Sequence, residues 1–175
     1  MEGQLERRED GRWQLRFVRR LPHPPLKVWR ALTEPEHLDA WFPFRMEGDR
    51  AAGAPLRFVP PDGRGPAIDG RMITFEPPSV LEFRWGGDEV LRFDVQPEGD
   101  GTSLTFMNII DEVGKAARDG AGWHACLDVL ACHLSGEEAP WTPTERWHHV
   151  HESYVARFGP EASAIGPPAQ TTERT

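Results

Sequence analysis

The chain has 175 residues, a length typical of a single domain. Hydrophobic residues make up 38% and charged residues 27%, which excludes a fully disordered chain. The formal net charge of −8 argues against a nucleic-acid partner, and the lack of any long apolar run argues against a membrane protein. The charged first residues are unlike a signal peptide, so we expect a cytoplasmic protein.

The first predicted element is a half-buried strand over residues 12–21, in which Trp13, Leu15 and Phe17 alternate with polar residues. Several arginines lie in and before this strand. We interpret them as the solvated face of an edge strand rather than as a nucleic-acid site.

Two short helices are predicted next. The first covers residues 26–32 and carries an apolar stripe that includes Trp29. A capping box beginning at Thr33 is expected to open the second, which carries Trp41 and Phe42.

The middle of the chain is predicted to form a series of antiparallel strands over residues 56–59, 70–76, 80–85, 89–96 and 102–110. Turn-forming residues connect neighbouring strands, so we expect a meander. Strand alternation places aromatic side chains on one face, namely Phe83, Trp85, Phe93 and Phe106.

A long helix over residues 113–134 follows, and its inner stripe includes Trp123 and Leu127. A last helix over residues 144–158 has an apolar stripe of its own. The small and polar residues 159–175 predict a disordered tail.

These elements divide the chain into three parts. Residues 1–11 are expected to be flexible, residues 12–158 to form one domain, and residues 159–175 to be disordered. Within the domain, the core covers residues 12–134 and an extra C-terminal helix covers residues 144–158.

Three stretches carry a resemblance to a known family: residues 25–42 (PLKVWRALTEPEHLDAWF), residues 70–85, and Gly122-Trp123 with the leucines that follow. They resemble the homologues of the activator of the heat-shock protein 90 ATPase, within the START-like (SRPBCC) superfamily, which shares its fold with the birch-pollen allergen. The resemblance implies an α+β helix-grip fold, in which a curved antiparallel sheet wraps around a long C-terminal helix and leaves a cavity between them.

Strand alternation, the helix stripe and the two short helices together predict the walls of that cavity. We expect an enclosed apolar pocket lined by Trp41, Phe42, Phe83, Trp85, Phe93, Phe106, Trp123 and Leu127. Whether these side chains leave a void or fill it stays open at this point.

No catalytic residue, cofactor or metal site is predicted. His148, His149, His151 and Glu152 lie close together on the last helix, but no distant residue completes a metal site, so we interpret them as a solvated face. Four-residue spacing predicts a surface hydrogen bond between His124 and Asp128 rather than an acid–base pair.

The two cysteines lie on different faces of one helix, which favours free thiols. Cys126 on the inner stripe is interpreted as a small buried hydrophobe rather than a nucleophile.

Three functions fit these observations. The first is binding of an apolar small molecule without catalysis. The second is an enzyme of the cyclase, dehydratase or hydrolase kind using the same cavity, and the third is a protein-interaction domain like that of the co-chaperones. Polar residues converging on the cavity would favour the enzyme, and an exposed apolar patch on the sheet would favour the interaction domain. A homodimer is left open.

Overall fold

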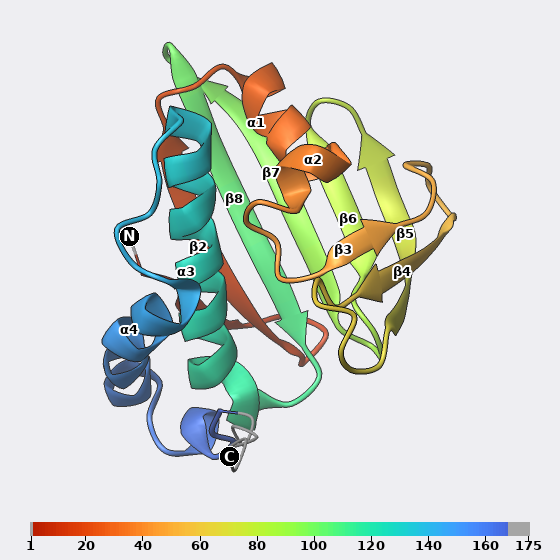
Figure 1. Ribbon diagram of the computed structural model, residues 1–175. Helices are drawn as coiled ribbons and strands as arrows, with labels where there is room; N and C mark the ends of the chain where they lie inside the picture. Colours follow the sequence, from red (N-terminus) through yellow and green to blue (C-terminus); the bar gives the residue numbers. More distant parts are fainter. Residues whose placement is uncertain (1, 168–175) are drawn as a thin grey trace, which may run out of the picture.

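The structure, a computed structural model, describes residues 2–167. Its strands are β1 (Gln4–Arg7), β2 (Trp13–Leu21), β3 (Arg45–Glu47), β4 (Pro55–Val59), β5 (Ile68–Glu76), β6 (Val80–Arg84), β7 (Val90–Glu98) and β8 (Gly101–Ile110). They form one antiparallel sheet of 8 strands in the order β1-β2-β8-β7-β6-β5-β4-β3 (Figure 1). The meander predicted for the middle of the chain is therefore present.

The inner face of the sheet is apolar because strand alternation brings large side chains into register. Phe106 of β8 lies opposite Phe17 of β2 on one side and Phe93 of β7 on the other. The Phe106 ring centroid is 5.9 Å from that of Phe17 and 4.7 Å from that of Phe93. Such offset aromatic pairs add to the free energy gained from burying each ring.

The helices lie on this inner side of the sheet, where the first three in the chain cover the face and the fourth packs on the third. They are α1 (Pro25–Thr33), α2 (Pro35–Leu38), α3 (Ala116–Ser135) and α4 (Pro143–Phe158), with single 3-10 turns η1 (Val113–Lys115) and η2 (Glu161–Ser163). Figure 1 shows α3 running along the sheet, with α1 and α2 beside its C-terminal half. The predicted helix-grip fold is confirmed.

The long helix α3 is held by its inner stripe and ends at a glycine. Trp123, Leu127 and Leu130 are buried at the three- and four-residue spacing that the sequence shows. Gly136 follows with φ 71°, a left-handed conformation that favours glycine, and its N–H closes the last turn.

Helix α4 starts in a capping box and packs on the outer side of α3. The Thr142 hydroxyl accepts from the Glu145 N–H, and the Glu145 carboxylate accepts from the Thr142 N–H at 2.7 Å. Val150 and Tyr154 are the buried residues of this helix.

The cap predicted at Thr33 does not form. Its hydroxyl donates to the Trp29 carbonyl at 2.9 Å, within α1. Glu34 occupies the N-cap position of α2 without a side-chain capping bond, and Pro35 follows it. A threonine in a last helical turn can bond its own helix in this way, and here that bond replaces the cap.

The N-terminal segment, predicted to be flexible, instead adds strand β1 to the edge of the sheet. Leu5 pairs with Leu15, so β2 is an inner strand and not the predicted edge. The Gly3 N–H donates to the Tyr154 hydroxyl at 2.8 Å. An added Cβ on Gly3 would lie 2.4 Å from the Phe17 ring, so only glycine lets the chain pass this close.

Part of the predicted disordered tail is also ordered. Residues 161–163 form η2 with Ala162 buried, and the Ile165 N–H donates to the Gly114 carbonyl at 3.0 Å. Residues 168–175 of that prediction lie outside the described residues. Among the residues that the structure describes, no helix is long and apolar enough to span a membrane.

Candidate functional site

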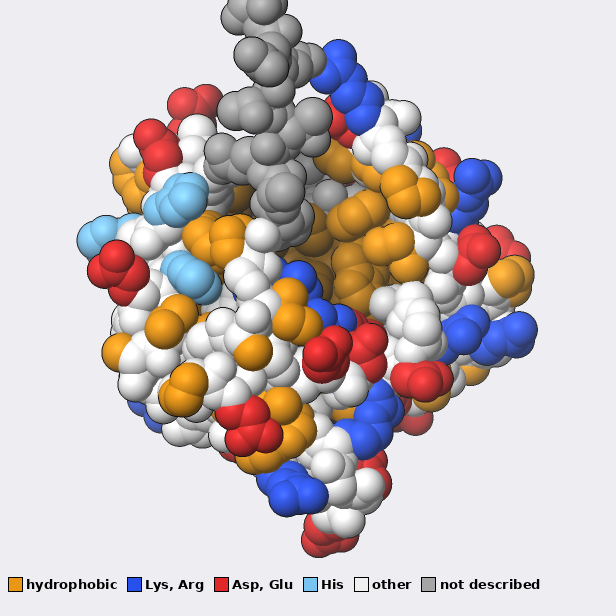
Figure 2. All heavy atoms as spheres, turned by 90° about the horizontal axis from the view of Figure 1, so that it is seen from below, with side chains coloured by type: hydrophobic (Ala, Val, Ile, Leu, Met, Phe, Trp, Pro, Cys, Tyr) orange, Lys and Arg blue, Asp and Glu red, His pale blue; other side chains and the backbone are white. Residues whose placement is uncertain are grey.

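A groove of about 680 Å³ lies between the first half of α3 and the ends of β6 and β8. Figure 2 views the molecule from below, where hydrophobic side chains gather in a hollow with charged side chains beside it. The volume is in the range of small-molecule sites.

Four aromatic side chains form the walls of this groove: Phe44, Trp85, Trp123 and Trp147. The Trp85 ring centroid is 5.1 Å from that of Phe44 and 6.0 Å from that of Trp123. Trp147 reaches the groove from α4, where its indole N–H donates to the Arg118 carbonyl at 3.0 Å. Because each indole is fixed by packing or by a hydrogen bond, the walls are preorganised.

One polar side chain, Asn108, is buried beside these walls. Its amide oxygen accepts from the Trp123 indole N–H at 3.0 Å, and its amide nitrogen has only a long contact of 3.5 Å with the Ile109 carbonyl. Asn108 has an exposed fraction of 0% and lines the groove. A buried amide with spare donor capacity can bond a polar ligand atom.

Charged groups form the other side of the groove. The Lys115 ammonium contacts the Glu89 carboxylate and lies 2.6 Å from the Asp111 carboxylate. Burial raises the pKa of Glu89, although Lys115 partly opposes this shift. The hydrogen bond from Lys115 lowers the pKa of Asp111.

Burial disfavours the charge of Lys115, yet its hydrogen bonds with Asp111 and Glu89 prevail and raise its pKa. One ammonium between two carboxylates leaves an excess of negative charge. This side of the groove therefore suits a hydroxyl or another hydrogen-bond donor better than an anion.

Cys126 also lines the groove, half-buried on α3. Burial raises the pKa of its thiol to about 12. The side chain is therefore a neutral thiol at neutral pH, as expected for a small hydrophobe.

The eight residues predicted to line the cavity do lie together in the structure. Their side chains pack against one another as one cluster. The Phe42 ring centroid lies 6.2 Å from that of Phe83 and 5.8 Å from that of Trp123, and the Phe106 centroid lies 4.9 Å from Trp123. Trp41 donates its indole N–H to the Ala31 carbonyl at 2.8 Å. These rings occupy the space between helix and sheet where the sequence predicted an enclosed pocket.

Two of the eight, Trp85 and Trp123, line the groove that the structure shows. The other six lie behind them in the core. The groove therefore lies at the edge of the predicted cluster, and ligand contact by any of the eight stays a prediction.

Sequence reasoning did not single out the polar residues of the groove. Asn108 carried a usable signal, because it lies two residues from Phe106 and Ile110 on the inward face of a strand. A polar residue at such a position is either bonded or functional. Glu89 and Lys115 are 26 residues apart, and only the fold joins them.

His124 is buried and Asp128 is half-buried, so the pair does not lie on the surface as predicted. Its side chains are 3.2 Å apart, and the Arg146 guanidinium donates to Asp128 at 2.8 Å. His124 also shares a hydrogen bond of 2.9 Å with the Tyr154 hydroxyl. The predicted contact between the two side chains is present, but its predicted surface location was wrong because α4 packs over this side of α3.

The arginines near the N-terminus were predicted as a solvated face, and Arg19 departs from that prediction. Its side chain is 9% exposed and lies 3.6 Å from Asp128. It also lies over the Phe17 ring at 5.6 Å. The neighbouring Arg20 is exposed, as predicted.

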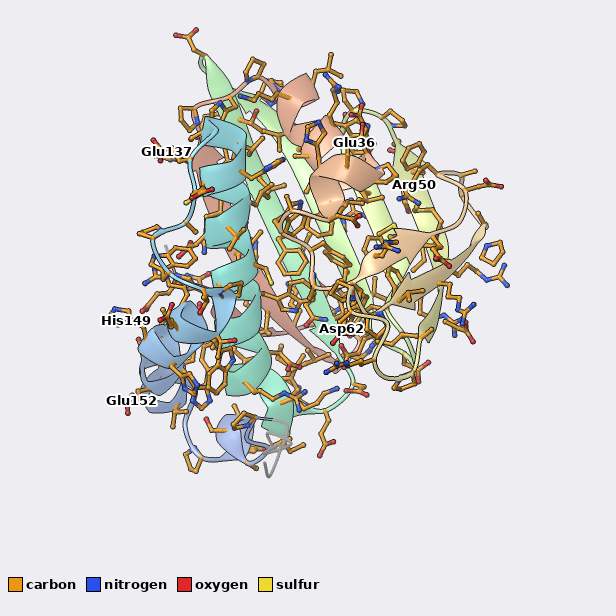
Figure 3. The ribbon with its side chains drawn as sticks, in the orientation of Figure 1. Glu36, Arg50, Asp62, Glu137, His149 and Glu152 are labelled. Atoms are coloured by element: carbon orange, nitrogen blue, oxygen red, sulfur yellow. The ribbon has the colours of Figure 1, made fainter. Side chains whose placement is uncertain are left out.

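The histidine-rich stretch lies on α4. Figure 3 shows His149 and Glu152 on the side of α4 that faces away from α3, and both are exposed. The His151 ring stacks on Trp147 at 4.2 Å. Within residues 2–167 no group of three or more acidic, histidine or cysteine side chains could hold a metal ion. The absence of a metal in solution stays a prediction.

Comparison with known sequences identifies the family. The family described as Activator of Hsp90 ATPase homolog 1-like protein matches residues 22–135. The chain belongs to this family. The matched region ends with α3, so β1, β2 and α4 all lie outside it. No curated protein sequence matches the chain significantly.

Several solved structures have the same fold as this protein. The crystal structure of CalU16 from Micromonospora echinospora has a TM-score of 0.72 at 24% identity, over 90% of this chain and 97% of that one. Protein EF2215 from Enterococcus faecalis, of unknown function, has a TM-score of 0.69 at 20% identity, over 91% and 93%. DynU16, described as a protein in the dynemicin biosynthetic locus, has a TM-score of 0.62 at 26% identity, over 70% and 47%.

Proposed function

We propose that the protein binds an apolar, ring-containing small molecule that carries a hydroxyl or similar donor, in the groove between α3 and the ends of β6 and β8. The main support for this proposal is that aromatic walls surround one buried amide, Asn108. The amide nitrogen of Asn108 makes only one long contact, so it can donate a hydrogen bond to a ligand. Apolar walls give affinity, and a few fixed polar groups give orientation.

The electrostatics of the groove favour an uncharged ligand over an anion. Glu89, Asp111 and Asp119 line it against Lys115 and Arg118, and Arg118 is bound to Asp119 at 2.7 Å. A ligand hydroxyl could donate to a carboxylate there, whereas a ligand carboxylate would be repelled. The similarity to DynU16 is in keeping with a small organic ligand.

Gly122 provides a direct test because it lines the groove from α3. A Cβ there would have its nearest neighbour at 4.0 Å, the Trp147 ring, so alanine fits without a clash. A leucine side chain at the same position would extend into the groove and occupy ligand space. Gly122→Leu is therefore the blocking variant, and Gly122→Ala is its matched control.

The uncharged fluorescent dye Nile red is the probe. We expect saturable binding by the native protein and by Gly122→Ala, and binding about tenfold weaker by Gly122→Leu. Indole fluorescence should change together with the probe signal because three tryptophans line the groove. Equal affinity of Gly122→Leu and Gly122→Ala, with both proteins folded, would place the ligand elsewhere and refute the proposal.

A further inference from the structure

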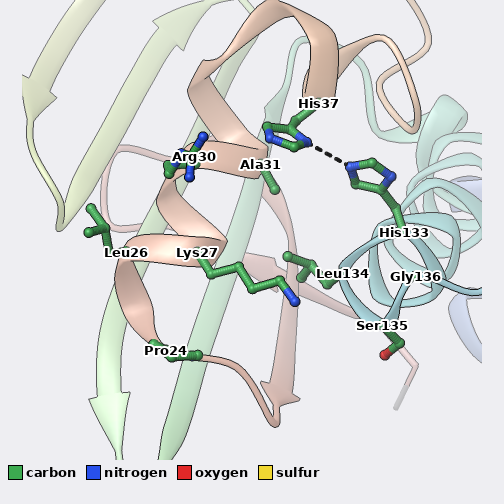
Figure 4. A pocket seen from close by; sticks show the side chains of 10 residues that line it. All are labelled: Pro24, Leu26, Lys27, Arg30, Ala31, His37, His133, Leu134, Ser135 and Gly136. Atoms are coloured by element: carbon green, nitrogen blue, oxygen red, sulfur yellow. Dashed lines mark hydrogen bonds between the residues drawn. The ribbon is translucent and has the colours of Figure 1, made fainter.

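A second hollow, of about 620 Å³, lies at the other end of α3. It is bounded by α1 on one side and by the last turn of α3 on the other (Figure 4). None of the residues that line it lines the first groove. The two hollows are therefore separate sites in the part of the chain that the structure describes.

The surface of this second hollow is largely apolar. Ala31 of α1 and Leu134 of α3 are buried and form part of its lining. Leu26 stands at its rim with an exposed fraction of 62%, the highest among the exposed large hydrophobic side chains of the described residues. A hydrocarbon chain lying in the hollow would cover Leu26 and remove this apolar surface from water.

The charged side chains that line the hollow are all basic. Lys27 and Arg30 line it together with His37 and His133, and no Asp or Glu does, in a chain with 28 acidic residues and a net charge of −8. Arg30 is already paired, because Glu34 accepts from its guanidinium at 2.8 and 3.1 Å.

Lys27 differs from Arg30 in this respect. Its ammonium group has no carboxylate partner within residues 2–167. In Figure 4 the Lys27 side chain extends across the hollow from α1 toward the end of α3. The hollow therefore holds one cation that a ligand could neutralise.

Two histidines close one side of the hollow. His37 Nδ1 and His133 Nε2 are 3.1 Å apart and join α2 to α3 through a hydrogen bond. Burial lowers the pKa of His133, and electrostatic repulsion from Lys27, and from His37 when His37 is protonated, lowers it further. No carboxylate offsets these effects on His133, which agrees with an excess of positive charge in the hollow.

We propose that this second hollow binds an amphipathic monoanion, a carboxylate with a hydrocarbon chain of medium length. The chain would lie on Leu26, Ala31 and Leu134, and the carboxylate would accept from the Lys27 ammonium. One unpaired cation matches one negative charge, while a doubly charged phosphate would leave a charge without a partner because Arg30 is engaged by Glu34.

The experiment uses the fact that the chain has only two lysines, Lys27 and Lys115, one in each hollow. Methylation of the lysines with isotopically labelled methyl groups gives each hollow its own NMR signal. Decanoate, kept below its aggregation concentration, is the probe, and decanol is the uncharged comparison with the same chain.

We expect decanoate to shift the Lys27 signal saturably and to leave the Lys115 signal in place. Lys27→Met keeps an apolar stem and removes the charge, so it should weaken decanoate binding about threefold to fivefold, as expected for a charge pair near the surface. Decanol binding should be the same in Lys27→Met as in the original protein. Arg64→Met, which removes a charge from an exposed loop, should change neither affinity.

Three results would overturn the proposal. One is a saturable shift of Lys115 in place of Lys27. Another is equal affinity for decanoate and decanol, which would show that the cation has no role. The third is unchanged decanoate binding by folded Lys27→Met. Because Gly122→Leu leaves this hollow intact, loss of Nile red binding and loss of decanoate binding report on separate sites.

Discussion

Tyr154, on α4, is the one tyrosine of the chain. Its side chain is fully buried against α3 and the N-terminal segment. Its hydroxyl accepts from the Gly3 N–H and bonds His124. Burial raises its pKa to about 12 from an ordinary value of 10.0. A single buried phenol is a convenient reporter, because every change in tyrosinate absorbance comes from it.

We expect the folded protein to titrate its phenol near pH 12 and the urea-unfolded protein to titrate near pH 10. Tyrosinate absorbance as a function of pH measures both. A folded-state midpoint near the ordinary value would show that α4 does not bury this side chain in solution.

The same shift predicts a loss of stability in alkali. Because the folded pKa lies above the unfolded one, the contribution of Tyr154 is fully present below about pH 10 and is lost as pH rises toward about 12. At about 1.4 kcal/mol per pKa unit, the loss approaches about 3 kcal/mol. The free energy of unfolding of Tyr154→Phe should fall less steeply than that of the original protein over this range.

At the scale of elements, two glycines of α3 differ in how much space a side chain would have: Gly120 lies close against α4, and Gly122 has more room. A Cβ on Gly120 would lie 3.2 Å from Tyr154 Cδ1, whereas the nearest neighbour of a Cβ on Gly122 is 4.0 Å away. Gly120 therefore allows α4 to pack closely, and Gly122 faces the groove.

We expect Gly120→Val to lower the free energy of unfolding by about 1–3 kcal/mol because the added methyl groups push against Tyr154. Gly122→Ala should raise it by about 0.5–1 kcal/mol through helix propensity. Urea denaturation of the two variants measures both changes. Similar destabilisation by both substitutions would contradict the packing described for α4.

At the scale of the whole molecule, the N-terminal segment holds the C-terminal helix. Glu2 accepts from the Ser153 hydroxyl at 2.9 Å and from the Arg157 guanidinium, and Gly3 bonds Tyr154. Strand β1 places these residues there by pairing with β2. The two ends of the described chain therefore stabilise each other.

Deleting residues 1–8 should loosen α4 as well as remove β1. We expect hydrogen exchange of the α4 amides to become faster by about tenfold or more, while the amides of β7 and β8 stay protected. Arg157→Gln, which removes only the ion pair with Glu2, should have a much smaller effect, since an exposed pair contributes little. Unchanged exchange of α4 in the truncated protein would refute the coupling.

Local patterns were enough to predict the apolar faces and the order of the longer elements, although they missed β1, β3 and η2. The alternation of Phe83, Phe93 and Phe106 and the stripe of Trp123 and Leu127 follow from strand and helix periodicity, and all five side chains are buried. The same patterns could not show whether the rings leave a void, because that depends on how side chains from four elements fill one volume.

The tertiary structure alone decided what covers the outer side of α3 and where the hollows lie. Periodicity marks His124 and Asp128 as outward, and only the packing of α4 buries His124 and half-buries Asp128. The groove joins Glu89, Asn108 and Lys115 from separate elements, and the second hollow joins Lys27 to His133. Contacts between residues so distant in sequence arise from the packing of whole elements, whereas local sequence determines the elements themselves.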